Sequence, residues 1–343
     1  MRQYWYGRAA MNSEGLYDLQ VNGYAGVDFN DAALSPDALD HALHAMLRAG
    51  VTHCLPTLIT AAKVEFGARL HALDRAIRTS RLGPVMVPGL HLEGPFLSPL
   101  PGYAGCHPAA AMIAPDPALL ERALAGIATP IRLLTLAPER PGALRLIAWA
   151  VRRGIVAAMG HTDADLATVL AAASAGLRLS THLGNALPQP QPKFLNPLVA
   201  QLSEDRLAAS FIADGIHIPP HALGVLLRAK GLTRSLLITD ATAAAAAVPG
   251  LYPFAGMTVE HTGEGAVREP GSAVLAGSGL RLDQAVRNVV AWGFATAEQA
   301  IAMASSQPAA LLARARSPSA VTWDAALRPK TVSVGEVTVR NPG

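Results

Sequence analysis

The sequence has few cysteines, few charges and few aromatic residues, and these shortages exclude several classes of protein. It contains two cysteines, Cys54 and Cys106, in 343 residues. That number is too small for a disulfide scaffold and is typical of a reducing cytoplasm, so we expect a cytoplasmic protein. Charged residues make up 15% of the chain and the net charge is +3, with no run of Lys or Arg. We therefore expect no nucleic-acid partner.

Long hydrophobic runs are also absent from the sequence. The alanine-rich stretch 241–248 is too short to span a bilayer, so we expect no membrane association. The first ten residues include the aromatic run Tyr4–Tyr6 and carry Arg2 and Arg8. They lack the apolar segment of a signal peptide. Because 51% of the residues are hydrophobic, the chain can instead bury a sizeable core.

Short apolar runs alternate with amphipathic stretches along most of the chain. We expect eight strands, at Leu16–Asn22, Val51–Leu58, Val85–Glu93, Ile131–Ala137, Ile155–His161, Leu179–His182, Ala208–Asp214 and Leu236–Asp240. Helices are expected between most of them, at Pro36–Arg48, Lys63–Arg78, Pro141–Arg152, Asp163–Ala175 and Pro219–Ala229. This alternation predicts an α/β protein with a (β/α)8 TIM-type barrel. A doubly wound sheet, which usually has fewer strands, is the alternative.

The C-terminal part of the sequence changes character after the expected barrel. Two further helices are predicted, followed by β-like segments that could pair with the start of the chain: Leu280–Trp292, Thr296–Ala313, Ala320–Trp323, Thr331–Val339 and Gln3–Tyr6. We therefore predict that the (β/α)8 barrel covers residues 14–313. A small accessory β segment would be built from residues 1–13 and 314–343.

Polar side chains are concentrated at the ends of the expected strands. They are Gln20, Asn22, Glu93, His161, His182, Asp214 and Asp240. In a closed barrel the carboxyl ends of the strands meet on one face, which is where the chemistry of such barrels is found. The sequence therefore predicts one polar active face.

Three of these strand-end residues, Glu93, His161 and His182, are of types that bind metals. Taken singly, each is more often a structural residue at a strand end. Together they form a carboxylate–imidazole set suited to Zn2+, with room for water at the fourth position. Fe2+, Co2+ and Mn2+ accept the same ligands, so the set predicts a divalent metal, with zinc first among the candidates.

Asp240 follows the eighth expected strand and could act as a general base toward the attacking water and then as an acid toward the leaving amine. The alternative is a helix N-cap, for which Asp is favoured. Gln20 and Asn22 lie two residues apart on the first strand, so their side chains share a face. Both are poor zinc ligands, which favours one metal over two. They could instead only form hydrogen bonds in the barrel mouth.

Two further histidines lie in loops on the predicted active face. His107 follows the third strand, and His217 lies just beyond the seventh. Either could contact substrate or a developing oxyanion, although loop histidines are more often solvated surface residues. Cys106 beside His107 raises the alternative of a thiol nucleophile. That alternative is disfavoured because the sequence shows no activating base for it.

Seven stretches of the sequence, spread from about Gly15 to Ala313, carry a further signal: Asp18–Gly23, His91–Phe96, Gly160–Ala164, Thr181–Ala186, Ala213–His217, Thr239–Thr242 and Leu275–Asn288. As a set they closely resemble the N-acetylglucosamine-6-phosphate deacetylase family of the amidohydrolase superfamily. The resemblance implies hydrolysis of the acetamide of N-acetylglucosamine 6-phosphate to glucosamine 6-phosphate and acetate, in amino-sugar catabolism.

The resemblance also implies a role for each matching residue. It assigns the metal to Glu93, His161 and His182, acid–base catalysis to Asp240, and polarisation of the acetyl carbonyl to His107. The sugar phosphate would be held by Asn185, by the backbone of Ala186 and by His217. The Gln–x–Asn pattern of Gln20 and Asn22 resembles that of the single-metal branch of the family.

The sequence departs from the family in two places. In the family, an Arg that reaches across a homodimer completes the phosphate site, whereas the spacing after Asn185 places Lys193 there. Lys binds phosphate as a point charge and lacks the bidentate fork of Arg. Family members also usually have a longer segment before the first strand, which begins here at Leu16. We therefore expect a reduced accessory domain.

These departures keep one alternative open, an amidohydrolase that deacylates a non-phosphorylated N-acyl sugar or another small amide. A separate, non-enzymatic alternative is a protein that binds a sugar phosphate without turnover. It would be stabilised by the ligand but would release no acetate.

Overall fold

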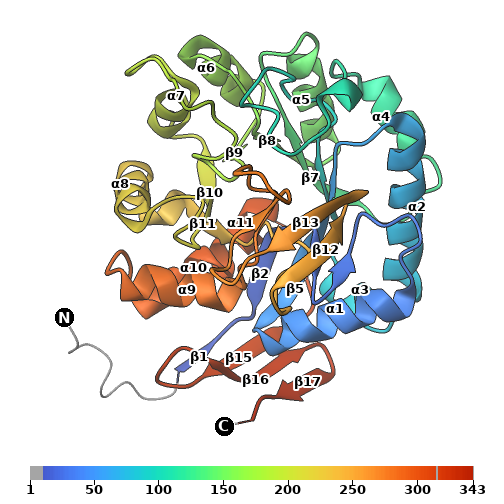
Figure 1. Cartoon of the computed structure of the whole chain (residues 1–343), viewed down its shortest axis with the longest axis vertical. Coiled ribbons are helices and arrows are strands. Elements are labelled where there is room, and N and C mark those ends of the chain that lie inside the picture. The colour runs from blue at the N-terminus through green and yellow to red at the C-terminus, as the bar shows by residue number, and fades with distance from the viewer. Residues whose placement is uncertain (1–10, 314–315, 343) are drawn as a thin grey trace.

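Eight parallel strands form the centre of the computed structural model, which describes residues 11–313 and 316–342 (Figure 1). In sheet order they are β11 (Ser235–Ile238), β10 (Ala208–Ile212), β9 (Leu179–Ser180), β8 (Val156–Met159), β7 (Ile131–Leu136), β6 (Leu90–Glu93), β5 (Val51–Ile59) and β2 (Leu16–Val21). The strands β2 and β5 are buried along their whole length. Such continuous burial is characteristic of parallel strands covered on both faces.

The barrel closes between its first and last strands. The backbone N–H of Asp240 donates to the carbonyl of Gln20 at 2.9 Å, and that of Asn22 donates to the carbonyl of Ala241 at 2.7 Å. These bonds join the carboxyl ends of β2 and β11. The predicted TIM-type barrel is therefore confirmed, and the doubly wound alternative is wrong.

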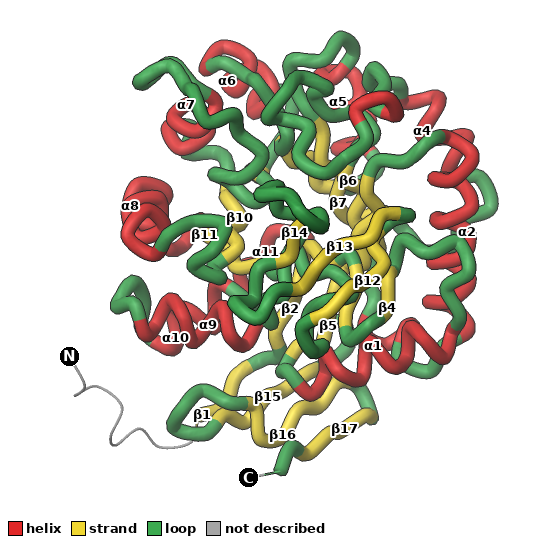
Figure 2. Tube along the Cα trace, in the orientation of Figure 1, coloured by secondary structure: helices red, strands yellow, loops and turns green. Residues whose placement is uncertain are grey.

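Helices surround the strands, as Figure 2 shows with helices in red and strands in yellow. They are α1 (Pro36–Arg48), α2 (Lys63–Thr79), α3 (Gly83–Met86), α4 (Pro117–Ala123), α5 (Ala143–Arg152), α6 (Leu166–Ser174), α7 (Pro197–Ser203), α8 (Pro220–Lys230), α9 (Leu282–Ala291), α10 (Ala297–Met303) and α11 (Ser306–Leu312). Helix α1 has the limits that its sequence predicts, because the Ser35 side chain caps it and Pro36 occupies its first turn.

A small antiparallel sheet lies at one side of the barrel, at the bottom of Figure 1. Its strands, in order, are β1 (Met11–Ser13), β15 (Ser319–Trp323), β16 (Pro329–Val334) and β17 (Val337–Arg340). The first and last parts of the described chain thus pair, as expected. The predicted strand Gln3–Tyr6 lies outside the described residues, and the division at 14–313 stays a prediction.

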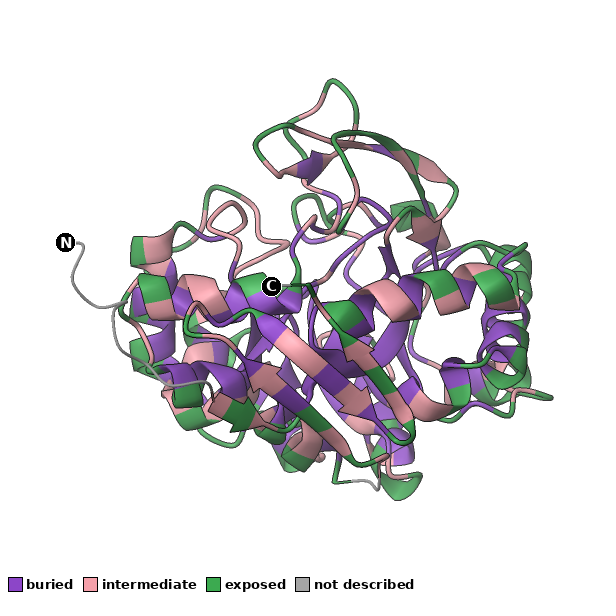
Figure 3. Ribbon diagram, turned by 90° about the horizontal axis from the view of Figure 1, so that it is seen from below, coloured by how far each residue is buried: buried purple, intermediate pink, exposed green. Residues whose placement is uncertain are grey.

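A second small sheet was not predicted. It contains β12 (Gly250–Phe254), β13 (Met257–His261) and β14 (Val267–Arg268), and it projects from the barrel at the top of Figure 3. A two-stranded ribbon of β3 (Gly23–Tyr24) and β4 (Val27–Asp28) lies beside the first barrel strand. The Asp28 carboxylate accepts a hydrogen bond from the backbone N–H of Ala255 at 2.6 Å, which fastens the β12–β13 turn to this ribbon.

Some expected elements have different limits in the structure. The run Val85–Glu93 is not one strand, because its start belongs to α3 and only Leu90–Glu93 joins the barrel. The stretch Thr296–Ala313 divides into α10 and α11, and Thr331–Val339 folds back as the β16–β17 hairpin around Gly335. Within the described residues, no helix is both long and apolar enough to cross a membrane.

Candidate active site

The predicted polar face is built at the carboxyl ends of β6, β8, β9 and β11. Glu93 is the last residue of β6, whereas His161, His182 and Asp240 lie just beyond the other three strands. These three residues have positive φ values of 52°, 31° and 50°. Non-glycine residues adopt this backbone conformation at a cost, and it is concentrated at functional sites. The strained backbone at these three residues therefore supports a functional site at the carboxyl ends of the strands.

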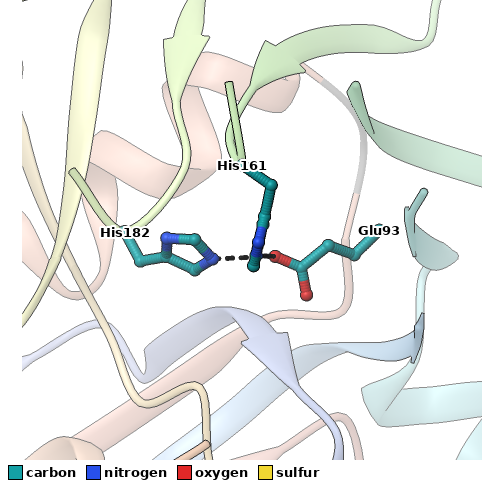
Figure 4. A group of neighbouring side chains, drawn as sticks. All are labelled: Glu93, His161 and His182. Carbon is teal, nitrogen blue, oxygen red and sulfur yellow. Dashed lines mark hydrogen bonds and ion pairs between the residues drawn. The ribbon is translucent and has the colours of Figure 1, made fainter. Parts of the chain in front are cut away.

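Glu93, His161 and His182 converge on one point, as Figure 4 shows. The Glu93 Oε1 atom lies 2.8 Å from His182 Nε2 and 3.3 Å from His161 Nε2. One donor atom from each of the three residues lies within 4.8 Å of the others, and all three residues are buried. The sequence-predicted ligand set is thus brought together from the ends of three different strands.

The chemistry of these donors fits a divalent metal ion. The Nδ1 atom of His161 lies 2.8 Å from the Tyr103 carbonyl, so it carries the ring proton and leaves the Nε2 lone pair toward Glu93. Such a backbone partner is typical of metal-binding histidines. His182 Nδ1 is buried and has no hydrogen-bond partner among the described residues. Two imidazoles and one carboxylate are a common set for zinc and similar ions.

The electrostatics of the cluster favour an ionised Glu93. Burial alone would raise the pKa of Glu93, but contacts with His161 and His182 hold this pKa well below its usual range. Burial disfavours the charged form of His182, yet the Glu93 carboxylate outweighs this effect and raises the pKa of His182. The ionised Glu93 carboxylate therefore stabilises positive charge at the point where the imidazoles face it.

Asp240 is linked to this centre through two amide side chains. Its Oδ1 accepts hydrogen bonds from Gln20 Nε2 at 3.1 Å and from Asn22 Nδ2 at 2.7 Å. The same Gln20 nitrogen lies 3.1 Å from Glu93 Oε2. Burial, followed by the charge of Glu93, raises the pKa of Asp240 to about 6. Asp240 is thus a carboxylate that can both accept and donate a proton near neutral pH.

His107 is buried beside the cluster and is not a solvated loop residue. Its ring lies 4.5 Å from that of His161, and its Nε2 is 3.7 Å from Glu93 Oε2. Its Nδ1 forms a hydrogen bond of 3.0 Å with the Thr60 hydroxyl. Burial lowers the pKa of His107 to about 3, so the ring is neutral. Burial raises the pKa of the neighbouring Cys106 thiol, which opposes a nucleophilic role for it.

His217 is held by Asp214, which lies just beyond β10. The Asp214 Oδ2 atom is 2.6 Å from His217 Nδ1, and Oδ1 accepts the backbone N–H groups of Ile216 and His217. Asp214 therefore fixes the orientation of the His217 ring and holds a proton on its Nδ1. The charge of His217 also acts on Asp240 and lowers its pKa, which places the two residues on the same face.

The remaining predicted residues lie in the segment after β9. The backbone and side-chain nitrogens of Asn185 donate to the carbonyl of His182 at 3.1 and 2.9 Å. Ala186 has a positive φ of 51°. Lys193 is exposed in the loop before α7, and among the described residues its side chain makes no hydrogen bond or ion pair. The structure thus places Asn185 and Ala186 beside the cluster, whereas Lys193 remains in solvent.

Thr60 and Tyr103 were not predicted from the sequence as residues of the site. Thr60 forms a hydrogen bond with His107, and Tyr103 forms one with His161. Thr60 directly follows β5, so the strand-end rule that found Glu93 would also have found it. Tyr103 contributes its carbonyl from an irregular loop, and its hydroxyl lies 2.5 Å from Asp163. A backbone contact of this kind leaves no signal in residue type. It could be found only in the folded structure.

Comparisons with known proteins agree with this geometry. No family model matches the chain. The chain is 34% identical to N-acetylglucosamine-6-phosphate deacetylase of Bacillus subtilis, covering 80% of this chain and 68% of that protein. It is 36% identical to N-acetylgalactosamine-6-phosphate deacetylase of Escherichia coli O157:H7, covering 86% and 76%. The human N-acetylglucosamine-6-phosphate deacetylase is 33% identical, with 91% and 76% covered.

A solved structure gives the same assignment. It is a variant of N-acetyl-D-glucosamine-6-phosphate deacetylase from Mycobacterium smegmatis in complex with N-acetyl-D-glucosamine-6-phosphate. It superposes with a TM-score of 0.84 at 32% identity, covering 95% of this chain and 86% of that one. The relatives are deacetylases, which hydrolyse amide bonds, so this chain is a hydrolase of that kind. It belongs to the N-acetylglucosamine-6-phosphate deacetylase family of the amidohydrolase superfamily.

Proposed function

We propose that the protein hydrolyses the acetamide of N-acetylglucosamine 6-phosphate to glucosamine 6-phosphate and acetate, as a step of amino-sugar catabolism. The observation that carries the proposal is the convergence of Glu93, His161 and His182 within 4.8 Å, beside a carboxylate poised for proton transfer. The Mycobacterium smegmatis relative bound to N-acetyl-D-glucosamine-6-phosphate supports the choice of substrate. Location in the cytoplasm is part of the proposal and is supported by two free thiols, Cys54 and Cys106.

We assign one zinc ion to Glu93, His161 and His182. Zinc bound there would supply Lewis acidity for the amide carbonyl and would acidify water. The assignment of a single ion is supported by Gln20 and Asn22, whose amide nitrogens already donate to Glu93 and Asp240. Amide side chains are poor zinc ligands. In this proposal Gln20 and Asn22 therefore orient the two carboxylates and do not bind a second ion.

In this proposal Asp240 moves the proton. Its Oδ1 is fixed by Gln20 and Asn22, whereas its Oδ2 accepts no hydrogen bond from the described residues. The free oxygen can accept a proton from the attacking water and then give it to the leaving nitrogen. Asn22 Oδ1 is buried without a partner in the described structure, so it can accept a hydrogen bond from substrate.

His107 is assigned to the acetyl carbonyl. Its neutral ring bonds the Thr60 hydroxyl through Nδ1 and directs Nε2 toward Glu93. When Thr60 donates to Nδ1, the proton lies on Nε2 and the ring is a hydrogen-bond donor. A fixed donor next to the reacting carbonyl stabilises the charge that develops on its oxygen.

The sugar phosphate is assigned to Asn185, the backbone of Ala186, His217 and Lys193. The N–H of Ala186 forms no hydrogen bond with the described residues, and its positive φ turns the chain beside His182. The positive charge of Lys193 complements phosphate without a bidentate fork.

We also propose a homodimer. Phe194 and Leu195 follow Lys193 and are 77% and 90% exposed. Adjacent apolar side chains with that exposure are typical of a protein interface. Changing both to Ser should convert the dimer to monomer in light scattering. Val64→Ser, at a residue on α2 that is 84% exposed, is the matched control and should leave the mass unchanged.

Acetate release by the zinc-loaded protein tests the proposed activity. The substrates are N-acetylglucosamine 6-phosphate, its galactosamine epimer and N-acetylglucosamine itself. We expect fast release from the glucosamine phosphate and little from the sugar without phosphate. Equal release with and without phosphate would contradict the phosphate site and favour a non-phosphorylated N-acyl substrate. Stabilisation by the sugar phosphate without acetate would indicate a binding protein.

The galactosamine epimer is a second candidate for the substrate. The relative from Escherichia coli O157:H7, which is 36% identical, is named N-acetylgalactosamine-6-phosphate deacetylase. The two epimers differ at one hydroxyl group. A higher kcat/KM for the galactosamine phosphate would replace the proposed substrate by its epimer and leave the chemistry of the mouth unchanged.

A further inference from the structure

A cavity of about 810 Å3 lies outside the catalytic mouth. It is bounded by the end of α1, the start of α9 and the edge of the small sheet, which lie together in the lower part of Figure 1. Neither Asp240 nor any residue of the Glu93 cluster lines it. Its volume is within the usual range for small-molecule sites, about 300–1,000 Å3. The cavity is large enough for an organic ligand.

The lining of this cavity is strongly cationic. Its cationic side chains come from three different parts of the chain: Arg48, Arg281, Arg287, Arg328 and Lys330. One carboxylate, Asp324, also lines it. A second carboxylate, the buried Asp283, lies behind the wall and binds Arg281 at 2.6 Å and Arg287 at 2.7 Å. Those two guanidinium groups are therefore fixed in place.

The other three cations form no ion pair with a carboxylate of the described residues. Among the described residues, the side chains of Arg48 and Arg328 form no hydrogen bond or ion pair. Lys330 Nζ has one partner, the Pro342 carbonyl at 3.4 Å. Asp324 Oδ1 is occupied by the backbone N–H groups of Ala326 and Arg328. The cationic side chains outnumber the carboxylates of Asp324 and Asp283, and such an excess of positive charge around one concave site creates a field that attracts anions.

Tyr24 provides an independent sign of a ligand. The residue is 1% exposed and lines the cavity, yet its hydroxyl has no hydrogen-bond partner in the described structure. A buried tyrosine hydroxyl usually finds a partner. Burial raises the pKa of Tyr24, so the group stays a neutral donor. A donor of this kind beside several arginines suits the oxygen atoms of a phosphate.

We propose that this cavity is a second binding site, which takes a small organic molecule bearing a phosphate or diphosphate group. The two fixed guanidinium groups of Arg281 and Arg287 form one wall. Arg48, Arg328 and Lys330 supply the mobile charges, and Tyr24 donates from the floor. The volume exceeds the needs of a free phosphate ion, so part of the ligand is organic. The proposal does not depend on the amide hydrolysis proposed above.

Calorimetric titration of the full chain with pyrophosphate tests this site. The titrations use a His217→Ala background, because His217 belongs to the proposed phosphate site of the mouth. We expect one site per chain and about tenfold weaker binding when Arg48→Ala and Arg328→Ala are combined. Tyr24→Phe, which removes one hydroxyl, should weaken binding by a smaller factor. Both changes keep the fold, because the two arginines are exposed and the ring remains.

The matched control combines Arg75→Ala and Arg152→Ala, which are exposed arginines on α2 and α5. It removes the same charge from other parts of the surface. Pyrophosphate affinity should stay within about twofold of the background protein. No binding in the His217→Ala background, or equal weakening by the two arginine pairs, would overturn the proposed site.

Discussion

Two buried polar clusters lie one above the other in the barrel and differ in how they use their hydrogen-bonding atoms. The lower cluster centres on His91, whose Nδ1 lies 3.2 Å from the Thr57 hydroxyl and whose Nε2 lies 2.8 Å from that of Thr135. Thr135 in turn bonds Thr181 at 2.8 Å. Every ring nitrogen and hydroxyl in this layer has a partner, and the layer needs no ligand.

The upper cluster, built around Glu93, uses similar residue types but leaves several atoms available. Asn22 Oδ1 is buried without a partner among the described residues, and Asp240 Oδ2 accepts no hydrogen bond there. Such atoms are costly unless something else binds them. The contrast shows that a satisfied polar layer supports the barrel, whereas an unsatisfied layer above it is prepared for a metal and substrate.

The largest expected effect comes from the upper cluster. Asp240→Asn keeps the shape of the side chain but removes its capacity to take a proton. We expect kcat to fall by about a hundredfold to ten-thousandfold. Metal content, measured by elemental analysis, should remain at the wild-type value, because Asp240 is not among the three assigned ligands. Turnover near the wild-type rate would contradict the proton-transfer role.

The lower cluster should respond in the opposite way. His91→Ala leaves the hydroxyls of Thr57 and Thr135 with fewer partners and opens a cavity, which should destabilise the fold by about 2–4 kcal/mol. His71→Ala is the control, since that ring is exposed on α2, and should change stability by less than about 0.5 kcal/mol. Denaturant unfolding measures both. If His91→Ala instead lost metal at unchanged stability, His91 would belong to the functional layer.

Asp18 sharpens the comparison with Asp240, because both of its oxygens are occupied. Oδ1 accepts the N–H groups of Gln20 and Thr239, and Oδ2 accepts the Thr239 hydroxyl. Burial raises the pKa of Asp18 to about 7. Between pH 4 and pH 7 the folded state therefore keeps a proton that the unfolded state has released. This contribution to stability is complete below the unfolded pKa and is lost as the pH rises through about 7.

Asp18→Asn removes this titration. We expect the stability of the wild type relative to the variant to fall by up to about 4 kcal/mol as the pH rises across that window. Urea unfolding at several pH values gives the difference. The control is Asp165→Asn at the cap of α6, where hydrogen bonds from Thr168 lower the pKa of the carboxyl. The stability difference between the wild type and Asp165→Asn should not change between pH 4 and pH 7. If the stability curves of the wild type and Asp18→Asn stay parallel over this range, the raised pKa of Asp18 would be refuted.

The smallest effect is expected at Lys193, which lies outside both clusters. An exposed lysine contributes little through its charge, so Lys193→Ala should raise KM for the phosphorylated substrate by about twofold to fivefold and leave kcat unchanged. Lys193→Arg restores a charge with a bidentate fork and should lower KM again. Initial-rate measurements distinguish the two parameters. An unchanged KM in both variants would remove Lys193 from the phosphate site.

The barrel could be predicted from sequence because its physics is local and repetitive. Apolar runs such as Val51–Ile59, buried along their whole length, indicate parallel strands, and capping residues such as Ser35 fix helix starts. The upper cluster could be predicted for the same reason, since Glu93, His161 and His182 each stand where an apolar run ends. The periodic pattern of apolar residues thus predicts the fold. The position of polar side chains at strand ends predicts the metal-binding set.

The elements that could not be predicted depend on contacts between distant residues. The sheet β12–β14 contains few of the alternating buried residues that identify a strand, because it stands away from the barrel. The burial of His107 depends on Thr60, and the orientation of His161 on the Tyr103 carbonyl. The sequence motif around His91 resembles that of a metal ligand. The hydrogen bonds that occupy both of its ring nitrogens therefore could not be predicted from the sequence.

Metal stoichiometry tests the contrast between the two clusters most directly. Wild type, His182→Ala and His91→Ala would be purified, loaded with zinc, dialysed and analysed for zinc per chain. We predict one zinc ion per chain in the wild type and in folded His91→Ala, and almost none in His182→Ala. Equal zinc content in His182→Ala and the wild type, or loss of zinc only in His91→Ala, would contradict this prediction.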